Sequence, residues 1–150
     1  MRINGILFLL LVFLLSACGG RKQNSEQQTQ TQTPAGTEKS AEMANHPGKK
    51  VYDSVCLVCH MADGSGVPGM HPPLIQTEWV TGDKETLIDI TLNGMSGKIE
   101  VNGETYNSIM PPNSHLSDNQ IADVLTYIRQ SFGNNSSEVT VEEVQKVRNK

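Results

Sequence analysis

The chain has 150 residues and a formal net charge of −4, and only 5% of its residues are aromatic. This length predicts one domain with short attachments, and the negative charge argues against nucleic acid as a partner, because phosphate backbones bind basic surfaces. A small domain with so few aromatic rings would have a thin core unless another apolar group filled it.

The N-terminus resembles a bacterial lipoprotein signal. An unbroken apolar run of ten residues occupies Ile6–Leu15 behind Arg2. It is too short to span a bilayer as a helix and fits the core of a signal peptide. The run ends in Leu-Ser-Ala-Cys, so we expect residues 1–17 to be removed and Cys18 to be acylated and to anchor the protein in a membrane. An ordinary secretory signal with an unrelated cysteine is the alternative.

A polar segment follows the lipid attachment site. Residues 18–45 are rich in Gln, Thr, Ser, Lys and Glu, and Met43 is almost the only large apolar residue among them. Such a composition cannot bury enough apolar surface to fold, which predicts a flexible linker. A flexible chain of this length spans roughly 25–30 Å, so the following domain could move near the membrane and reach partners.

A helix is predicted over about 47–58, because Pro47 suits a first helical position. It leads into the pattern Cys-x-x-Cys-His, formed by Cys56, Cys59 and His60, which is the attachment pattern of a c-type haem. Two thiols about one helical turn apart can add to the two vinyl groups of the porphyrin, and the next residue then presents an imidazole to the iron. The motif predicts one covalent haem c, with His60 as an iron ligand.

Two other interpretations share the Cys-x-x-Cys part of this motif. A thioredoxin-like redox pair needs a βαβ setting, which the flanking sequence does not offer. A zinc site needs two more ligands, but the remaining histidines, His46, His71 and His115, are scattered. Because c-type haem is attached outside the cytoplasm, the motif and the export signal agree on the cell envelope, with the domain facing the periplasm or the cell exterior.

The middle of the chain predicts a helix and a hairpin. A helix is expected from Lys84 to Leu92, with Asp83 as its N-cap and Gly94 at its end. Alternating residues around an Asn-Gly pair predict two very short strands within 98–106. The buried face of the helix should comprise Leu87, Ile88 and Thr91.

The iron needs a ligand on its other face, and methionine or histidine is the usual choice. Met110 lies fifty residues beyond the imidazole, which is enough chain to wrap around the haem edge. The two prolines that follow it stiffen the backbone and would help to hold a weak thioether bond. We therefore predict Met110 as the sixth ligand. Met95, His115 or His71 in its place, or an open site, are the alternatives.

Two capping boxes mark helices near the C-terminus. The Ser-x-x-Gln box at Ser117 predicts a helix to about Ser131, ended by Gly133. The Thr-x-x-Glu box at Thr140 predicts a short amphipathic helix within a C-terminal tail, residues 134–150. This second helix could lie on the surface, pack on the domain or dock a partner.

From His46 to Phe132 the residues resemble the class I cytochrome c family, with the attachment motif at the N-terminal end and a Met-Pro pair before the last core helix. The resemblance implies an all-α fold over residues 46–133, in which helices wrap around one haem and a short β-hairpin precedes the axial methionine. Gly48 and Tyr52 look like the positions where the first helix of the family crosses the last helix, against Tyr127.

The resemblance also implies roles for two residues that line the haem. Pro72 looks like the residue whose carbonyl accepts a hydrogen bond from the proximal histidine. Trp79 is expected at the haem edge, where a contact to a propionate and packing against the ring both stay open. The segment from Trp79 to the Met-Pro pair is similar to bacterial domains that serve membrane dehydrogenases, oxidases and reductases.

These features predict a membrane-tethered one-electron carrier, not an enzyme. It would shuttle electrons between a dehydrogenase or quinol-oxidising complex and a terminal oxidase or reductase. A haem-based sensor or gas-binding module with a labile sixth ligand is the alternative. A dihaem peroxidase would need a second attachment motif, which the sequence lacks, and a one-haem peroxidase would need an open iron face.

Overall fold

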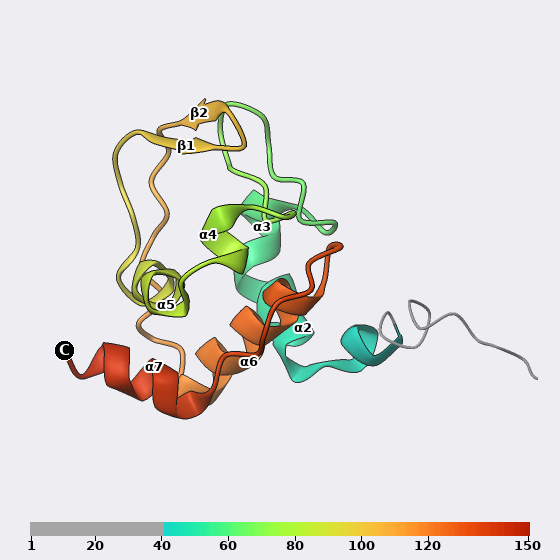
Figure 1. Cartoon of the computed structure of the whole chain (residues 1–150), viewed down its shortest axis with the longest axis vertical. Coiled ribbons are helices and arrows are strands. Elements are labelled where there is room, and N and C mark those ends of the chain that lie inside the picture. Colours follow the sequence, from blue (N-terminus) through green and yellow to red (C-terminus); the bar gives the residue numbers. More distant parts are fainter. Residues whose placement is uncertain (1–40) are drawn as a thin grey trace, which may run out of the picture. The chain divides into compact units, whose positions relative to one another are not determined.

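The computed structural model describes residues 41–150. The predicted signal peptide, Cys18 and most of the predicted linker lie outside the described residues. The described part is mostly helical, with one two-stranded hairpin, as Figure 1 shows. No helix within residues 41–150 is long and apolar enough to cross a membrane.

The prediction of a linker through residue 45 is wrong for its last five residues. Residues 41–45 are helical, and Met43 is only 6% exposed within the main hydrophobic cluster. The polar residues around Met43 do not indicate that it is buried, because burial of a single side chain depends on a tertiary contact and not on local composition.

The helix that carries the attachment motif has three parts. It runs through α2 (Pro47–Val51), the π-helical turn η1 (Tyr52–Cys56) and α3 (Leu57–His60). The N–H of Leu57 donates to the carbonyl of Tyr52, the wide spacing of a π turn. The helix begins where the sequence predicts and ends two residues later than predicted. The π turn was not predicted from the sequence.

The middle elements confirm the capping signals. A short helix, α4 (Glu78–Thr81), precedes α5 (Lys84–Asn93). The side chain of Asp83 accepts from the N–H of Thr86 at the start of α5, and Gly94 ends the helix. The predicted buried face is confirmed, with one more residue, and comprises Leu87, Ile88, Thr91 and Leu92.

The predicted hairpin is also present. Strands β1 (Ile99–Val101) and β2 (Glu104–Tyr106) pair in antiparallel register. Asn102 and Gly103 form the turn, and both have positive φ angles, of 51° and 82°. An Asn-Gly pair adopts this backbone conformation more readily than other residues, which is why the pair marks the hairpin in the sequence.

The long helix α6 (Asp118–Gln130) crosses α2 at very close range. Its predicted capping box is present, with Ser117 as the N-cap. A Cβ atom at Gly48 would lie 2.0 Å from the carbonyl oxygen of Asp123, so only glycine allows this crossing. The ring centroids of Tyr52 and Tyr127 are 5.5 Å apart beside it. The crossing therefore sets the angle between α6 and the helix that carries the attachment motif, which we call the motif helix.

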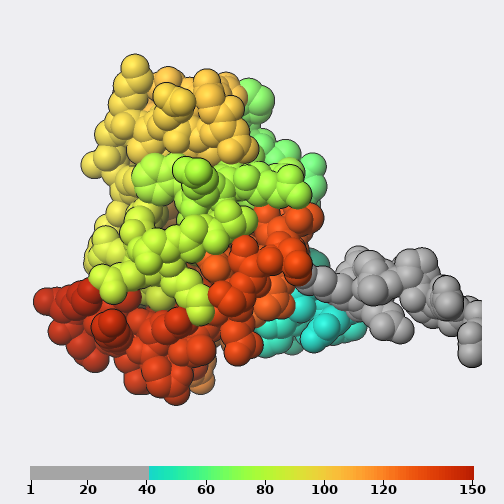
Figure 2. Space-filling view, viewed as in Figure 1, coloured from blue at the N-terminus to red at the C-terminus, as the bar shows by residue number. Residues whose placement is uncertain are grey.

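The C-terminal segment is part of the domain and not a separate tail. Helix α7 (Val141–Arg148) begins with the predicted capping box at Thr140 and packs on α5 and α6. It supplies Val144, which is fully buried, and Val147, which is 8% exposed, to the main hydrophobic cluster. In Figures 1 and 2 this segment and the hairpin lie at opposite ends of the view.

Candidate haem site

A cavity lies between the motif helix, α5, α6 and the segment after the hairpin. It consists of two adjoining parts, an inner and an outer one, which share seven lining residues, among them His60 and Met110. Among the described residues, those that line the two parts include no Asp, Glu, Lys or Arg. Apolar side chains from three helices line the inner part: Val80, Leu87, Ile90, Val124, Leu125 and Ile128.

The two cysteines of the motif lie at the wall of this cavity. Cys56 lines both parts and Cys59 lines the outer part, and neither is in a disulfide. Burial, followed by the nearby charge of Cys59, raises the pKa of the Cys56 thiol to about 11. Before haem is attached, Cys56 is therefore a thiol and not a thiolate at neutral pH.

The imidazole of His60 also lines both parts of the cavity. Its Nδ1 lies 2.9 Å from the carbonyl oxygen of Pro72. Because a carbonyl only accepts, Nδ1 carries the proton and Nε2 keeps its lone pair. Burial lowers the pKa of His60, against a smaller raising effect of the Pro72 hydrogen bond. A neutral imidazole with an available Nε2 is the form that ligates iron.

Met110 reaches the same cavity from the other end of the domain. Its thioether side chain lines both parts of the cavity. A Cβ atom at Gly94 would lie 2.5 Å from the carbonyl oxygen of Met110, so the glycine lets the methionine segment pass close to the end of α5. Buried Asn113 then ties the segment down, because its backbone N–H donates to the carbonyl of Thr91 over 3.1 Å.

Trp79 is half-buried and lines the inner part of the cavity. Its indole N–H donates to the carbonyl oxygen of Glu100 over 3.1 Å, which joins α4 to the first strand of the hairpin. Since this N–H already has an acceptor, the geometry favours packing of the ring over a hydrogen bond to a propionate. No pattern in the sequence predicts the contact between these two segments.

The other methionines and histidines of this region differ in position. Met61 and Met70 are 42% and 53% exposed and do not line the cavity. His115 is exposed and does not line it either, whereas His71 lines only the outer part. Met95 lines both parts, as Met110 does.

The donor set and the cavity together fit a haem c. Two thiols, a neutral imidazole and a thioether face one apolar space in which a large flat apolar group would complete the core. A comparison with known families gives the same result, because the model of the family described as Cytochrome c matches residues 46–132. The chain belongs to the cytochrome c family. Its Cys56 and Cys59 form the haem-binding motif of that family, and its cofactor is haem c.

Individual relatives agree with this assignment. Cytochrome c-552 of Thermus thermophilus is 37% identical over 117 residues, which cover 72% of this chain and 78% of the relative. The cytochrome c subunit of the alcohol dehydrogenase (quinone) of Gluconobacter oxydans is 35% identical over 105 residues, or 67% of this chain. A cbb3-type cytochrome c oxidase subunit CcoP from Azospirillum is 35% identical over 94 residues, or 57% of this chain.

The chain spans only part of the length of two of these relatives. The chain covers only 22% of the alcohol dehydrogenase subunit and 28% of the oxidase subunit. It is therefore similar to one domain within those longer proteins and to most of the Thermus protein. Members of the cytochrome c family are electron carriers and not enzymes, and this chain is an electron carrier of that family.

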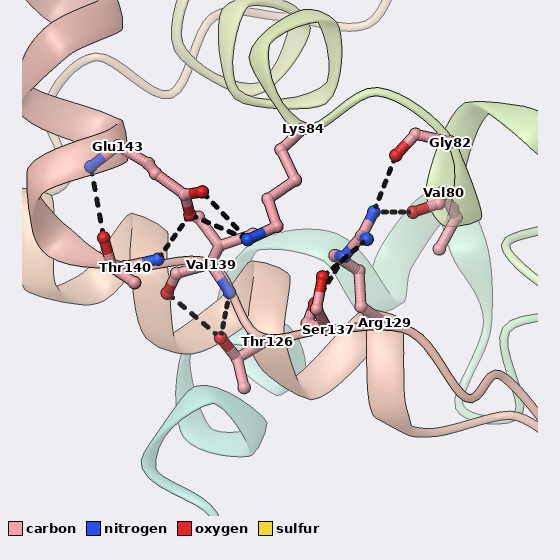
Figure 3. A network of polar contacts seen from close by, with 9 residues as sticks. All are labelled: Val80, Gly82, Lys84, Thr126, Arg129, Ser137, Val139, Thr140 and Glu143. Carbon is pink, nitrogen blue, oxygen red and sulfur yellow. Dashed lines mark hydrogen bonds and ion pairs between the residues drawn. The ribbon is translucent and has the colours of Figure 1, made fainter.

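A polar network that the sequence did not predict surrounds Arg129, as Figure 3 shows. Arg129 is 3% exposed, and its guanidinium donates to the carbonyl oxygens of Val80 at 2.6 Å, Ser137 at 2.7 Å and Gly82 at 3.2 Å. A signal was present, because Arg129 is four residues after Leu125 and so lies on the apolar face of its helix. An arginine there needs buried acceptors.

Proposed function

We propose that this protein is a membrane-tethered one-electron carrier in which His60 and Met110 are the two axial ligands of the haem iron. The observation that carries this proposal is the single apolar cavity lined by both side chains and by Cys56 and Cys59. When bound, the haem supplies a one-electron iron couple. The polypeptide binds the haem, orients it and shields it from solvent.

Contacts within the polypeptide hold both proposed ligands, His60 and Met110, in place. The Pro72 carbonyl orients the ring of His60, and the contacts of Gly94 and Asn113 fix the backbone on either side of Met110. Rigid ligands on both sides favour electron transfer, because little has to move when the iron changes charge and neither position is open to a substrate. A thioether ligand also raises the potential of the iron, which suits the high-potential end of a respiratory chain.

Substitution of Met110 by alanine tests the ligand assignment. The expected result is a protein that keeps its covalent haem but has a lower reduction potential, because the substitution removes a ligand that favours reduced iron. Met70→Ala is the matched control, since Met70 is exposed and does not line the cavity. If both the potential and the position of the iron–sulfur charge-transfer band stay unchanged in Met110→Ala, another residue is the sixth ligand.

The membrane tether rests on the signal-like N-terminus and on Cys18. A lipid on this cysteine would hold the haem domain at the surface of a membrane in the bacterial cell envelope, facing the periplasm or the exterior. Cys18→Ser should move the protein from the membrane fraction to the soluble fraction after cell breakage. If the variant stays with the membranes, the proposed lipid anchor is wrong.

The proposed partners are membrane dehydrogenases and terminal oxidases or reductases, because relatives of this chain are subunits of such complexes. Val58 and Ile109, which are 79% and 74% exposed, flank the outer part of the cavity. Exposed apolar residues around an uncharged opening fit a partner with an apolar docking surface.

Lysine substitutions test this docking surface. Val58→Lys with Ile109→Lys should slow the oxidation of the reduced protein by membrane vesicles of the source bacterium by more than the measured change in its potential explains. Gln145→Lys, on the exposed side of α7, is the control for added positive charge. An equal rate for the double variant and the control would place the docking surface elsewhere.

A further inference from the structure

Two methionines of the cavity wall are joined through their backbones. Met95 and Met110 form an isolated antiparallel bridge, in which the N–H of each residue donates to the carbonyl of the other, over 2.9 Å and 2.8 Å. Met95 follows Gly94 at the end of α5, and Met110 follows the hairpin. The bridge therefore closes the loop that carries the hairpin.

This pairing places both thioethers on one side. Residues that are directly opposite in an antiparallel pair project their side chains to the same face, with Cβ atoms about 4.5–5.5 Å apart. The cavity agrees with this expectation, because Met95 and Met110 both line its inner and its outer part. The site thus contains two flexible sulfur donors within reach of the same space.

We propose that Met95 is a reserve ligand, which binds the haem iron whenever the thioether of Met110 is removed or displaced. This inference rests on the proposed ligation by Met110 and extends it. Among the described residues that line the cavity, the only other side chain that could replace Met110 is His71. It lines the outer part alone and is next to Pro72, which contacts the opposite ligand, His60.

The backbone explains why Met95 would stay in position. The two bridge hydrogen bonds use only main-chain atoms, so truncation of the Met110 side chain leaves them intact. The space that the thioether vacates borders Met95, and methionine has three rotatable bonds with which to occupy an irregular gap. The bridge therefore keeps the backbone of Met95 in place, and the sulfur atom of Met95 can move toward the iron by side-chain rotation without a change in the fold.

The test uses four holoprotein variants: Met110→Ala, Met95→Leu, the double variant with both changes, and Met110→Ala combined with Met70→Leu as a control. Oxidised Met110→Ala should keep the iron–sulfur charge-transfer band, at a shifted position, and the double variant should lose it. The control should behave as Met110→Ala does. The reduction potential should fall further in the double variant than in Met110→Ala.

The outcomes separate this inference from the proposed function. Loss of the band in Met110→Ala would overturn the reserve role of Met95 while leaving Met110 as the ligand. Loss of the band in Met95→Leu alone would make Met95 the primary ligand and overturn both proposals. If Met110→Ala fails to incorporate haem, Met110→Leu keeps the side-chain volume and its spectra are judged by the same criteria, with the band retained or lost.

Discussion

The cavity and the contact between α6 and α7 bury side chains in opposite ways. The cavity is lined by apolar side chains, and segments that meet at its edges surround it, such as the bridge between Met95 and Met110. The packing of α6 against α4, α7 and the segment before α7 is partly polar. There Arg129 donates to three backbone carbonyls and the hydroxyl of Thr126 is hydrogen-bonded to both backbone groups of Val139.

We expect these two regions to depend on the cofactor to different degrees. Apolar side chains that line a cofactor site stabilise the fold through their contacts with the cofactor, whereas hydrogen-bonded buried polar groups and packed valines stabilise it through contacts within the chain. The α6–α7 contact also involves residues after 132, where the family match ends. We call the contacts of Thr126 and Arg129 with their backbone partners, together with the buried Val144 and Val147 of α7, the brace. We expect the brace to stabilise the domain whether or not haem is bound.

The largest expected effect comes from removal of the covalent attachment. The variant with Cys56→Ala and Cys59→Ala should lose its haem on a denaturing gel and lose most of its cooperative thermal unfolding, because the cavity then has nothing to complete its core. Val58→Ala, between the two cysteines and 79% exposed, is the control and should keep its haem. An apoprotein as stable as the holoprotein would contradict the comparison.

The next effect should come from Arg129→Met. Its buried acceptors, above all the carbonyl of Val80, would lose their donor, at a cost of about 2–4 kcal/mol in the free energy of unfolding. Denaturant unfolding of the holoprotein measures this loss, with exposed Lys146→Met as the control. The reduction potential should stay unchanged. A shifted potential without a loss of stability would show that the brace acts on the haem site instead.

A smaller effect is expected for Val144→Ala. Val144 is fully buried, so the lost methyl groups and the space that they leave should cost about 1–2 kcal/mol. Gln145→Ala, at the exposed neighbouring position, is the control. If both variants unfold at the same denaturant concentration as the unmodified protein, α7 is not part of the cooperative unit, and the brace does not exist in solution.

The smallest effect concerns the ion pair of Lys84 and Glu143, which joins α5 to α7 over 2.8 Å (Figure 3). The hydrogen bond from Lys84, followed by that from the backbone of Thr140, lowers the pKa of Glu143 below its ordinary value of 4.5. A lowered folded-state pKa means that the stabilisation is complete above the ordinary value and is lost as pH falls through the folded value.

Glu143→Gln should therefore be less stable than the unmodified protein at pH 7, by less than about 1 kcal/mol because the pair is partly exposed. The difference should shrink as the pH of the unfolding experiment falls below about 4. Exposed Glu138→Gln is the matched control. A difference that persists unchanged at pH 3 would mean that the carboxylate charge of Glu143 is not what stabilises the contact.

Local signals account for what the sequence predicts well. The caps at Ser117 and Thr140 and the turn at Asn102 depend on neighbours within four residues, so they are visible without knowledge of the fold. The haem motif is equally local. The burial of Met43 and the acceptors of Arg129 depend on contacts between distant segments, and no spacing rule within one segment reveals them.

The site was predictable to the same degree. The sequence indicates that Cys56, Cys59, His60 and Met110 belong together, and all four line the cavity. Their arrangement was not predictable in full, because the pairing of Met110 with another methionine is a backbone contact across a long loop. Composition does not specify such a contact.

The π turn at Tyr52–Cys56 has a consequence for how the chain tolerates changes in length. In a continuous α-helix each residue advances by about 100° around the axis, and the wide turn sets α3 out of phase with α2. One half of the helix can then face α6 while the other half faces the cavity. Deletion of one residue here would restore the α-helical phase and turn the cysteines away from the cavity. We expect this segment to accept substitutions far more readily than a deletion.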